Sequence, residues 1–373
     1  MKYLVIGAGR MAAGVVFDLL KHGRTEEILI ADVSDAALKA IKQRFKDKRI
    51  RTIQSGAGEE KQICSLMQGA DGALSAVPYD YNPDLTRWAI ENHCHFVDLG
   101  GNNSVVEKQF GYHKAAQKNG VGVIPDCGLA PGMVSVVAVD LLDQLPQADS
   151  LEIRVGGLPV DPRTPLNYML VFSVHGLTNE YIEPSVIIKN GKITEVPSMT
   201  GLESLSFPEP FGQLEAFYTS GGTSTLPQTF KKRLKNLDYK TIRYPGHCHI
   251  FKAMIDLGFT DQRPLARGMT RRQIFEDLLI EPLTYKSGDV VLIRLTASEG
   301  TKQIVYETVE YGDTTNNLTA MMRTTAFPAA IILEMLVDGT IKSRGVMRQE
   351  EAVPAAPFMN ALAMRNIRFT KHG

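Results

Sequence analysis

The stretch KYLVIGAGRMAAGVVFDLLKHG constrains the fold of this chain more than any other part of it. Residues 3–6 are entirely apolar, as is typical of a buried parallel strand. Gly7 and Gly9 then allow a tight turn into a helix predicted from residue 10, and Ala12 occupies the third small position of G-x-G-x-x-G/A. Between a strand and a helix, this pattern predicts a dinucleotide site. The glycines let the backbone approach a pyrophosphate, which the helix N-terminus holds.

A carboxylate closes the second apolar run, EILIADVS. Asp32 stands close to the spacing of about 20 residues that is usual for the acid that binds the adenosine ribose. A carboxylate there accepts hydrogen bonds from both ribose hydroxyls and repels a 2′-phosphate. Val33 and Ser34 follow without an Arg or Lys that would pair with such a phosphate, so the sequence predicts NAD rather than NADP. The alternative is that Asp32 only caps the next helix.

Strands alternate with single helices through the first part of the chain, with further strands predicted at IRTIQSG, DGALSAVP, CHFVDLGG and VGVIPDCG. This rhythm predicts an α/β fold with a parallel, doubly wound Rossmann sheet. Ligands of such sheets bind outside the carboxyl ends of the strands. We therefore expect cofactor contacts from residues that follow the strands: Gly7, Gly9, Arg10, Met11, Asp32, Val33, Ala76, Val77, Pro78 and Asp98.

After Pro131 the pattern changes to long, β-branched runs, including LEIRVGGLP, YMLVFSVHGL, YKTIRYPG and VVLIRLTASEG, which we interpret as strands. KNGK, inside another such run, predicts a type I′ hairpin. These runs predict a second α+β domain with a mixed or antiparallel sheet, over residues 131–321. The apolar helix TTAFPAAIILEMLVDG is too hydrophobic to stand alone, so we expect residues 1–130 plus about 322–373 to form the Rossmann domain. GTIKSRGV is expected to be exposed.

Charge and composition limit the classes of partner that this chain is expected to bind. Lys plus Arg and Asp plus Glu both number 41, so neither nucleic acid nor a membrane surface is predicted to bind. We interpret the basic cluster Arg267, Arg271 and Arg272 as a solvated helix face. No apolar run approaches the ~18–20 residues of a membrane span, and MKYLVIGAG lacks the features of a secretory signal. Four scattered cysteines without a CxxC pair favour reduced thiols, and hence a cytoplasmic protein.

The triplet His-Cys-His occurs twice, at residues 93–95 and 247–249. The first lies at the start of the predicted fifth strand, at the end of the sheet away from the cofactor. The second follows IRYPG and continues into a predicted helix. A zinc site would need both triplets together with further partners. No metal is therefore predicted.

An ordered series of motifs carries a resemblance to a known family. DCGLAPGMVS, VGGLPVDPRTPLNY, SVHGLTNEYIEP, VIIKNGKITEV, LEAFYTSGGTSTL and TIRYPGH follow the GAG turn in that order. They resemble the saccharopine dehydrogenase superfamily and, within it, the L-lysine 6-dehydrogenases, over about residues 1–340. The resemblance implies a homodimer, an NAD-type cofactor, and oxidative removal of the lysine ε-amino group. Ala130 stands where saccharopine reductases tend to have Asp, and Gly221 where some relatives have an acid.

This chemistry calls for particular side chains. The substrate amine must lose a proton before hydride leaves its carbon, so a base is needed, and the α-carboxylate needs an anchor. We assign Asp126 to the amine and Asp98 mainly to the cofactor side; each could instead cap a strand-end turn. Arg243 is predicted to grip the carboxylate bidentately, and His247 to donate to the substrate or relay a proton. Tyr168 and Cys127 are further candidates for contact with the substrate.

Two other functions remain open. One is an NADP reductase that joins an amine to an aldehyde, as saccharopine reductase and carboxynorspermidine synthase do. The other is a dimer that senses the nucleotide without catalysis. The substrate is open as well, because the length of a pocket for lysine, ornithine or a longer diamino acid depends on packing.

Overall fold

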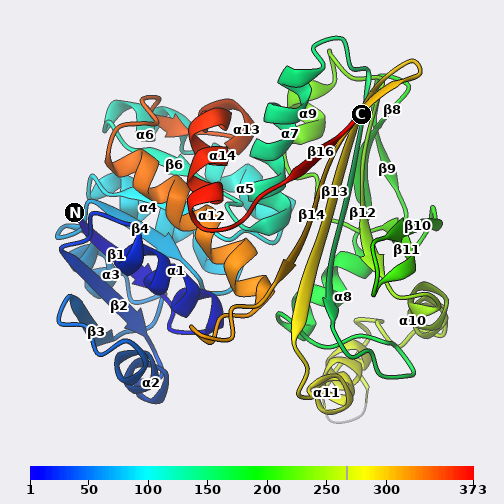
Figure 1. Cartoon of the computed structure of the whole chain (residues 1–373). Helices are drawn as coiled ribbons and strands as arrows, with labels where there is room; N and C mark the ends of the chain where they lie inside the picture. The colour runs from blue at the N-terminus through cyan, green and yellow to red at the C-terminus, as the bar shows by residue number, and fades with distance from the viewer. Residues whose placement is uncertain (266–267) are drawn as a thin grey trace. The chain divides into compact units, whose positions relative to one another are not determined.

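The computed structural model describes residues 1–265 and 268–373 (Figure 1). Within them the chain forms two compact units, each built from two segments of sequence. Arg267, one member of the predicted basic cluster, lies outside the described residues. The first unit contains Met1–Asp140 and Met322–Arg368, and the second contains Leu141–Met321 and Phe369–Gly373.

The boundaries of these units differ from the predicted ones at two points. The first unit continues past residue 130 to Asp140, into the helix α7 (Val134–Gln144). The final residues belong to the second unit, because strand β16 (Thr370–His372) pairs with β14 (Lys302–Tyr311). The chain therefore passes from the first unit to the second and back, and then contributes one last strand to the second.

The first unit contains a seven-stranded parallel sheet in the order β15-β6-β5-β4-β1-β2-β3. The order reverses between β1 and β4, as in a doubly wound sheet, so the predicted fold class is confirmed. The strands are β1 (Lys2–Ile6), β2 (Glu27–Asp32), β3 (Ile50–Gln54), β4 (Gly72–Ser75), β5 (His95–Asp98), β6 (Gly122–Ile124) and β15 (Gly345–Val346).

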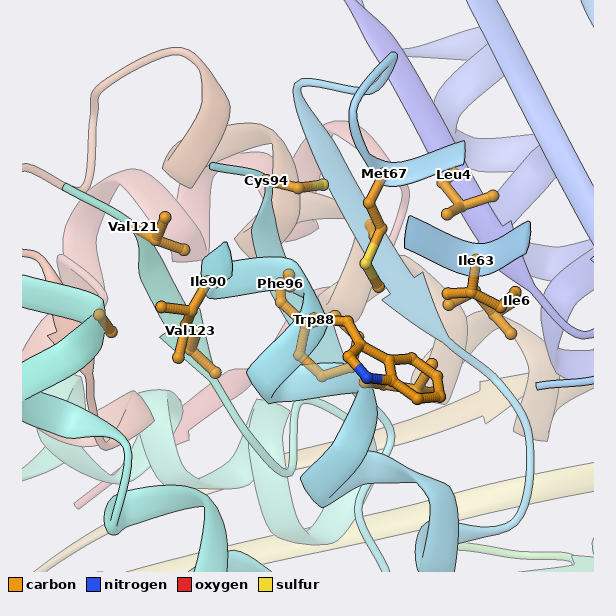
Figure 2. Close-up of a cluster of buried hydrophobic side chains, with 14 of the residues drawn as sticks. Leu4, Ile6, Ile63, Met67, Trp88, Ile90, Cys94, Phe96, Val121 and Val123 are labelled. Carbon is orange, nitrogen blue, oxygen red and sulfur yellow. The ribbon is translucent and has the colours of Figure 1, made fainter. Parts of the chain in front are cut away.

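Helices cover both faces of this sheet. Side chains of α3, α4 and α6 join Leu4, Ile6 and Phe96 in one apolar cluster, in which Trp88 is 4% exposed (Figure 2). On the other face Gly72 lies against Leu333 of α12. The helices of this unit are α1 (Arg10–Lys21), α2 (Asp35–Phe45), α3 (Glu60–Met67), α4 (Asn82–Glu91), α5 (Asn103–Phe110), α6 (His113–Lys118), α12 (Ala320–Val337), α13 (Gln349–Ala352) and α14 (Ala355–Met364), besides α7.

The long apolar helix α12 packs within the first unit, as predicted. A Cβ at Gly14 of α1 would lie only 2.7 Å from the Ala326 Cβ of α12, so the two helices approach closely because Gly14 has no side chain. The expectation that no stretch approaches the length of a membrane span needs correction. By length and composition α12 would qualify, but 78% of it is buried inside the protein, which is usual for a core helix.

GTIKSRGV, expected to be exposed, contributes the edge strand β15 instead. Gly345 and Val346 are buried and pair with Gly122 and Val123 of β6. Gly345 has φ +122°, and a Cβ there would collide with the His113 ring. Only two residues of this stretch enter the sheet. A strand of two residues is too short to produce a recognisable hydrophobic pattern, so the polar residues beside it dominated the prediction.

The second unit contains a nine-stranded mixed sheet. Its main path is β10-β11-β12-β7-β13-β14-β16, with β8 paired to β12 and β9 to β8. Only β12 and β7 pair in parallel, which confirms the mixed, mostly antiparallel sheet. Asn190 and Gly191 both have positive φ, as the predicted type I′ hairpin between β8 and β9 requires. The remaining strands are β7 (Ser150–Pro159), β8 (Ser185–Lys189), β9 (Lys192–Val196), β10 (Glu203–Phe207), β11 (Gly212–Tyr218), β12 (Asn236–Arg243) and β13 (Asp289–Glu299).

One predicted strand of the second unit is wrong. YMLVFSVHGL forms irregular backbone followed by the helix α8 (Val174–Ile182). The Ser173 hydroxyl caps this helix by accepting a hydrogen bond from the Gly176 N–H, at 3.1 Å, a start signal that the apolar run obscured. The other helices of the unit are α9 (Leu226–Phe230), α10 (His247–Asp256) and α11 (Arg271–Leu283). Side chains of α8, α10 and α11 share an apolar cluster with Tyr168 and Phe217.

Candidate functional site

The turn between β1 and α1 has the geometry that a pyrophosphate site requires. Gly7 has φ +107°, and a Cβ at this position would lie 2.8 Å from the carbonyl oxygen of Ala76, after β4. Only glycine fits both conditions. Gly9 precedes α1 and, like Arg10, is exposed, so the first N–H groups of the helix are open to an anion.

Asp32 ends β2 beside this turn. Its Oδ2 accepts from the Ala8 N–H at 2.7 Å, and its Oδ1 accepts from the Ser34 N–H at 2.7 Å. The cap of α2 is Ser34 rather than Asp32, because the Ser34 hydroxyl accepts from the Ala37 N–H. The helix-capping alternative for Asp32 is therefore wrong. Each carboxylate oxygen keeps a second lone pair, and the side chain is only partly buried.

Other predicted cofactor residues line the same edge of the sheet. Ala76 and Val77 are partly exposed and Pro78 is exposed, directly after β4, and β4 neighbours β1. Met11 is partly exposed in the first turn of α1, and Val33 is 71% exposed after β2. The sheet thus brings together the residues predicted to hold a dinucleotide, with the exception of Asp98.

Asp98 has a structural position that the sequence did not predict. It is fully buried. Its Oδ1 accepts from the N–H groups of Gly100 and Asp126, at 2.8 and 3.1 Å, and its Oδ2 accepts from the Gln109 amide at 2.7 Å. Burial raises the pKa of this carboxyl. Direct contact with ribose or amine is therefore not its role here; it joins the loops that follow β5 and β6.

Asp126, the candidate base, is held in an unusual conformation. Its φ is +60°, which is uncommon outside glycine, and its side chain is 2% exposed. A Cβ at Gly100 would meet its Oδ1 at 1.9 Å, so glycine is required there. Strain of this kind is commonest at functional sites.

The neighbouring Cys127 is fully buried, and its thiol donates to the Ile124 carbonyl at 3.2 Å. Burial raises the pKa of this thiol. The prediction that Cys127 contacts the substrate is therefore not supported.

In the second unit, Arg243 ends β12 and is 2% exposed. Its Nε donates to the Tyr181 hydroxyl at 2.8 Å, and its Nη1 donates to the Ile242 carbonyl at 2.9 Å. The guanidinium lies 4.7 Å from the centroid of the Tyr168 ring, a cation–π contact. Among the described residues no carboxylate lies within ion-pair distance of Arg243, and none offers an acceptor to Nη2.

The carboxylate nearest to Arg243 in the sheet register is already engaged. Glu215 of β11 is the partner of Arg243 across the ladder. Its two oxygens accept from the N–H groups of Gly246 and Cys248, at 2.9 and 2.7 Å, and so cap α10. Arg243 is therefore a buried positive charge that other groups orient but do not neutralise.

His247 is linked to Arg243 through the Tyr181 hydroxyl. It is 1% exposed, and its Nδ1 lies 2.9 Å from the Leu166 carbonyl, which only accepts, so Nδ1 carries the proton. Nε2 then accepts from the Tyr181 hydroxyl at 3.0 Å, and that hydroxyl in turn accepts from Arg243. Burial, followed by the charge of Arg243, lowers the pKa of His247 to about 3. The predicted proton relay is thus corrected: His247 stays neutral and orients Tyr181.

Two residues of α8 that interact with Arg243, Tyr181 and Glu180, were not predicted, because the start of this helix was interpreted as a strand. Burial raises the pKa of Glu180 to about 7, against the lowering effect of Arg243. The Ser173 cap was the signal that would have revealed the helix. Tyr168, predicted as a weaker candidate, is fully buried and contributes the face of its ring to Arg243.

Arg272 fixes the position of α8. It is 7% exposed, so its assignment to a solvated face is wrong. Its Nε pairs with Glu276 at 2.6 Å, and its Nη2 donates to the side chains of Thr178 and Asn179 at 2.8 and 2.6 Å. These bonds join α11 to the helix that carries Glu180 and Tyr181.

The two His-Cys-His triplets have separate local environments. His95 begins β5, and its Nδ1 accepts from the Gly122 N–H at 2.9 Å. The Nδ1 atom of His93 lies 3.2 Å from the carbonyl oxygen of Asn119. Within residues 1–265 and 268–373, no group of three or more His, Cys, Asp or Glu side chains has the geometry to hold a metal ion.

A parallel sheet with a glycine turn after β1 and a carboxylate closing β2 places the first unit among the Rossmann dinucleotide-binding domains. Comparison with known families agrees. Residues 3–124 match the saccharopine dehydrogenase NADP binding domain, and residues 128–367 match the saccharopine dehydrogenase C-terminal domain. The chain belongs to the saccharopine dehydrogenase family.

Its curated relatives are distant. The mitochondrial alpha-aminoadipic semialdehyde synthase of Rattus norvegicus is 21% identical over 99% of this chain and 47% of its own length. This chain therefore spans about half the length of such relatives. The saccharopine dehydrogenase [NADP(+), L-glutamate-forming] of Saccharomyces cerevisiae is 20% identical over 98% of this chain and 96% of its own.

Solved structures share the fold. The apo saccharopine dehydrogenase (L-Glu forming) from Saccharomyces cerevisiae has a TM-score of 0.82 at 19% identity, covering 100% of this chain and 99% of its own. A homospermidine synthase from Legionella pneumophila in complex with NAD has a TM-score of 0.71 at 10% identity, covering 100% and 91%. At these identities the likeness extends to the fold alone.

Proposed function

We propose that this protein is a nicotinamide-dependent dehydrogenase that acts on the carbon–nitrogen bond of an amino acid. More specifically, we propose that it uses NAD to remove the ε-amino group of L-lysine. The observation that carries the proposal is Arg243, a buried guanidinium that aromatic and hydroxyl groups hold in place without a carboxylate partner in residues 1–265 and 268–373. Burying such a charge is costly unless a partner arrives, and the carboxylate of an amino acid supplies one.

The division of labour follows from the chemistry. Lysine arrives as an ammonium with a pKa near ~10.4, and the ε-nitrogen must lose this proton before its lone pair can expel hydride. The ε-carbon then loses a hydride to NAD and becomes an iminium carbon. Water adds to it and ammonia leaves, which gives aminoadipate semialdehyde; this cyclises to a piperideine carboxylate. Asp126 is our candidate for the base, and Arg243 for the anchor of the α-carboxylate.

A direct assay separates this function from its alternatives. The protein is incubated with NAD and a panel of amines, and the absorbance of reduced nicotinamide is followed. Lysine-dependent reduction with release of ammonia supports deamination. A reductase that joins amine and aldehyde would instead oxidise NADPH when both substrates are present, as the names of the relatives suggest. A nucleotide sensor would bind the coenzyme in calorimetry and never reduce it.

Asp32 tests the proposed preference for NAD. Replacing it by Ser removes the negative charge at the adenosine ribose, so Asp32→Ser should shift the NAD-to-NADP ratio of kcat/KM toward NADP by on the order of ten-fold or more. Initial rates at varied coenzyme concentration measure this ratio. A wild type that already favours NADP would refute the assignment.

We also propose a homodimer, which the family resemblance implies. In support, the second unit exposes large apolar side chains beside α10 and α11, among them Leu257 at 72% and Leu278 at 64%. Light scattering after gel filtration measures the oligomeric state. Leu278→Glu should shift the protein toward the monomer, whereas a wild type that is monomeric at micromolar concentration would contradict the proposal.

A further inference from the structure

Gln349 lies at the same edge of the parallel sheet as Asp126 and has no assigned function. It is the first residue of α13 and follows β15, whereas Asp126 follows β6, the strand with which β15 pairs in parallel. The carboxyl ends of these two neighbouring strands therefore bring the two residues together. Gln349 is buried, at 1% exposed.

The amide group of Gln349 binds the two peptide groups on either side of the Asp126 Cα. Its Nε2 donates to the carbonyl oxygen of Pro125 and to that of Asp126, the latter at 3.1 Å. Both partners are carbonyl oxygens, which only accept, so the nitrogen of the amide must face them. The first bond holds the peptide group before the Asp126 Cα, and the second holds the peptide group after it.

Asp98 binds the same two peptide groups through their N–H groups. Its Oδ1 accepts from the Asp126 N–H at 3.1 Å, and its carbonyl oxygen accepts from the Cys127 N–H at 2.7 Å. Successive carbonyl groups point the same way in helical conformations of either hand, whereas they alternate in a strand. Two carbonyls bound by one nitrogen, and two N–H groups bound by one residue, thus hold Asp126 at its φ of +60°.

Stability alone explains Gln349 poorly. Among the described residues its Oε1 meets no hydrogen-bond donor, although this atom is buried. An unsatisfied buried acceptor costs stability, and a methionine of similar length would avoid that cost. The residue type is better explained by the direction of its N–H donors, toward the backbone around Asp126.

We propose that Gln349 is a positioning residue for Asp126. It holds the backbone on the carbonyl side, as Asp98 does on the N–H side. The Asp126 Oδ1 lies only 1.9 Å from the position that a Cβ of Gly100 would take, so a return to negative φ would carry this carboxyl group away from Gly100. The inference rests on the proposed function, in which Asp126 is the base that takes the ammonium proton.

The test uses two variants of the full-length protein. Gln349→Met removes both donors at similar side-chain length, and Gln349→Asn keeps an amide on a shorter side chain, so the outcome does not depend on a single variant that folds. Crystal structures of both show the φ of Asp126 and the place of its carboxyl group. Initial rates with NAD and L-lysine give kcat and KM.

We expect Asp126 to leave positive φ in both variants. The value of kcat should fall by on the order of ten-fold or more, because a displaced base transfers the proton less well. The KM for lysine should change by less than about two-fold, because Arg243, the proposed anchor of the carboxylate, is unaltered. A residue that only stabilises the fold would not separate kcat from KM in this way.

His113→Leu is the matched control. The His113 Nδ1 donates to the carbonyl oxygen of Val346 at 2.8 Å, so this variant also removes a side-chain bond to the backbone, but from β15 rather than from the loop that contains Asp126. It should lower the urea midpoint of the first unit, which Trp88 fluorescence follows, and leave both kcat and the conformation of Asp126 unchanged.

The proposal is overturned if Asp126 keeps its φ and its place beside Gly100 in both Gln349 variants, or if it moves while kcat stays at the wild-type value. Equal losses of kcat in Gln349→Met and His113→Leu also overturn it, since they indicate a general effect on stability. If the wild type reduces NAD with no amine, the proposed deamination falls, and the crystal structures alone decide whether Gln349 positions Asp126.

Discussion

Two buried arginines, one in each unit, have opposite surroundings. Arg365 of the first unit has a side chain that is 3% exposed and binds Asp18 through two bonds of 2.7 Å, from Nε and Nη2. Nη2 also binds Glu334 at 2.9 Å. Arg243 of the second unit is as deeply buried, and its hydrogen bonds within the described part of the chain go to a hydroxyl and a carbonyl, besides its contacts with aromatic rings. The fold pairs Arg365 with two carboxylates, whereas Arg243 has no ion-pair partner among the described residues.

This difference in ion pairing distinguishes an arginine that stabilises the fold from an arginine that is available to a ligand. A buried ion pair can be replaced by apolar groups at little cost, but removing one member leaves a charge without a partner. Arg365 is a member of such a set. Among the residues that the structure describes, no carboxylate lies within ion-pair distance of Arg243, so its buried charge is a cost to the folded state that a bound carboxylate would reduce.

The largest expected effect is on stability, at Arg365. Arg365→Met leaves Asp18, which is fully buried, and Glu334 without their cation, and should cost roughly 3–5 kcal/mol of unfolding free energy. Trp88 is the only tryptophan in the sequence and lies in the core of the first unit, so its fluorescence during urea unfolding reports on this unit. Arg243→Met is the matched control and should leave this transition in place. Equal urea midpoints for Arg365→Met and Arg243→Met would show that the two arginines do not differ in their contribution to the stability of the first unit.

The next effect is on function, at Arg243. Arg243→Ala should raise the KM for lysine by on the order of tens-fold or more, because a charge-assisted contact worth ~2–3 kcal/mol is lost. Its folding should suffer less than that of Arg365→Met. Steady-state kinetics and thermal melts of the two variants measure both quantities. Unchanged kinetics in Arg243→Ala would exclude this residue from the site.

A smaller effect on the KM for lysine is expected from the groups that hold Arg243 in place. Tyr181→Phe keeps the aromatic ring but removes the hydroxyl that links the Arg243 Nε to His247, and should raise the KM several-fold, a loss of about 1 kcal/mol. The value of kcat should change less, because Tyr181 positions the anchor and does not touch the reacting carbon. Tyr168→Phe, which keeps the cation–π contact, is the control. A fall in kcat at constant KM would indicate that Tyr181 acts in the chemical step.

The sequence predicted the first unit better than the second. Gly7, Gly9 and Asp32 could be predicted because their spacing along the sequence is characteristic. The turn after β1 requires glycine for its positive φ and its close approach to Ala76, and the carboxylate ends the next strand. The helix α12 was also placed correctly, since so apolar a segment must be covered. The predictions that failed depended on distant partners: nothing near Asp98 in sequence indicates Gln109 or the Asp126 N–H as its ligands.

In the second unit the residue type was predictable but its surroundings were not. Arg243 was found because guanidinium is the usual ligand of a carboxylate, but Tyr181 and Glu180 come from a helix whose first residues, Val174–Leu177, were interpreted as a strand. His247 looked like a catalytic residue because histidine titrates near neutral pH. Its partners, the Leu166 carbonyl and the Tyr181 hydroxyl, are remote in sequence, and their contacts with its ring could be seen only in the structure.

The smallest effect is a pH dependence of stability, which tests whether Glu180 of the second unit is harder to ionise in the folded protein than in the unfolded chain. Burial raises the pKa of Glu180 from 4.5 to about 7 in the folded protein. The folded state thus favours the protonated form, and the stability from this group is present below about pH 4.5 and lost as pH rises toward about 7. Because the side chain is half-buried, we expect a loss of only about 1 kcal/mol.

Glu180→Gln removes this titration, so its stability advantage over the wild type should grow between about pH 5 and about pH 8. Glu183→Gln corrects for a nearby acid whose pKa burial also raises. Near-ultraviolet circular dichroism reports on the aromatic residues of both units, so a transition that it shows and that Trp88 fluorescence does not show is assigned to the second unit. A pH-independent difference between variant and wild type would mean that Glu180 is already neutralised within the fold, as Asp18 is by Arg365.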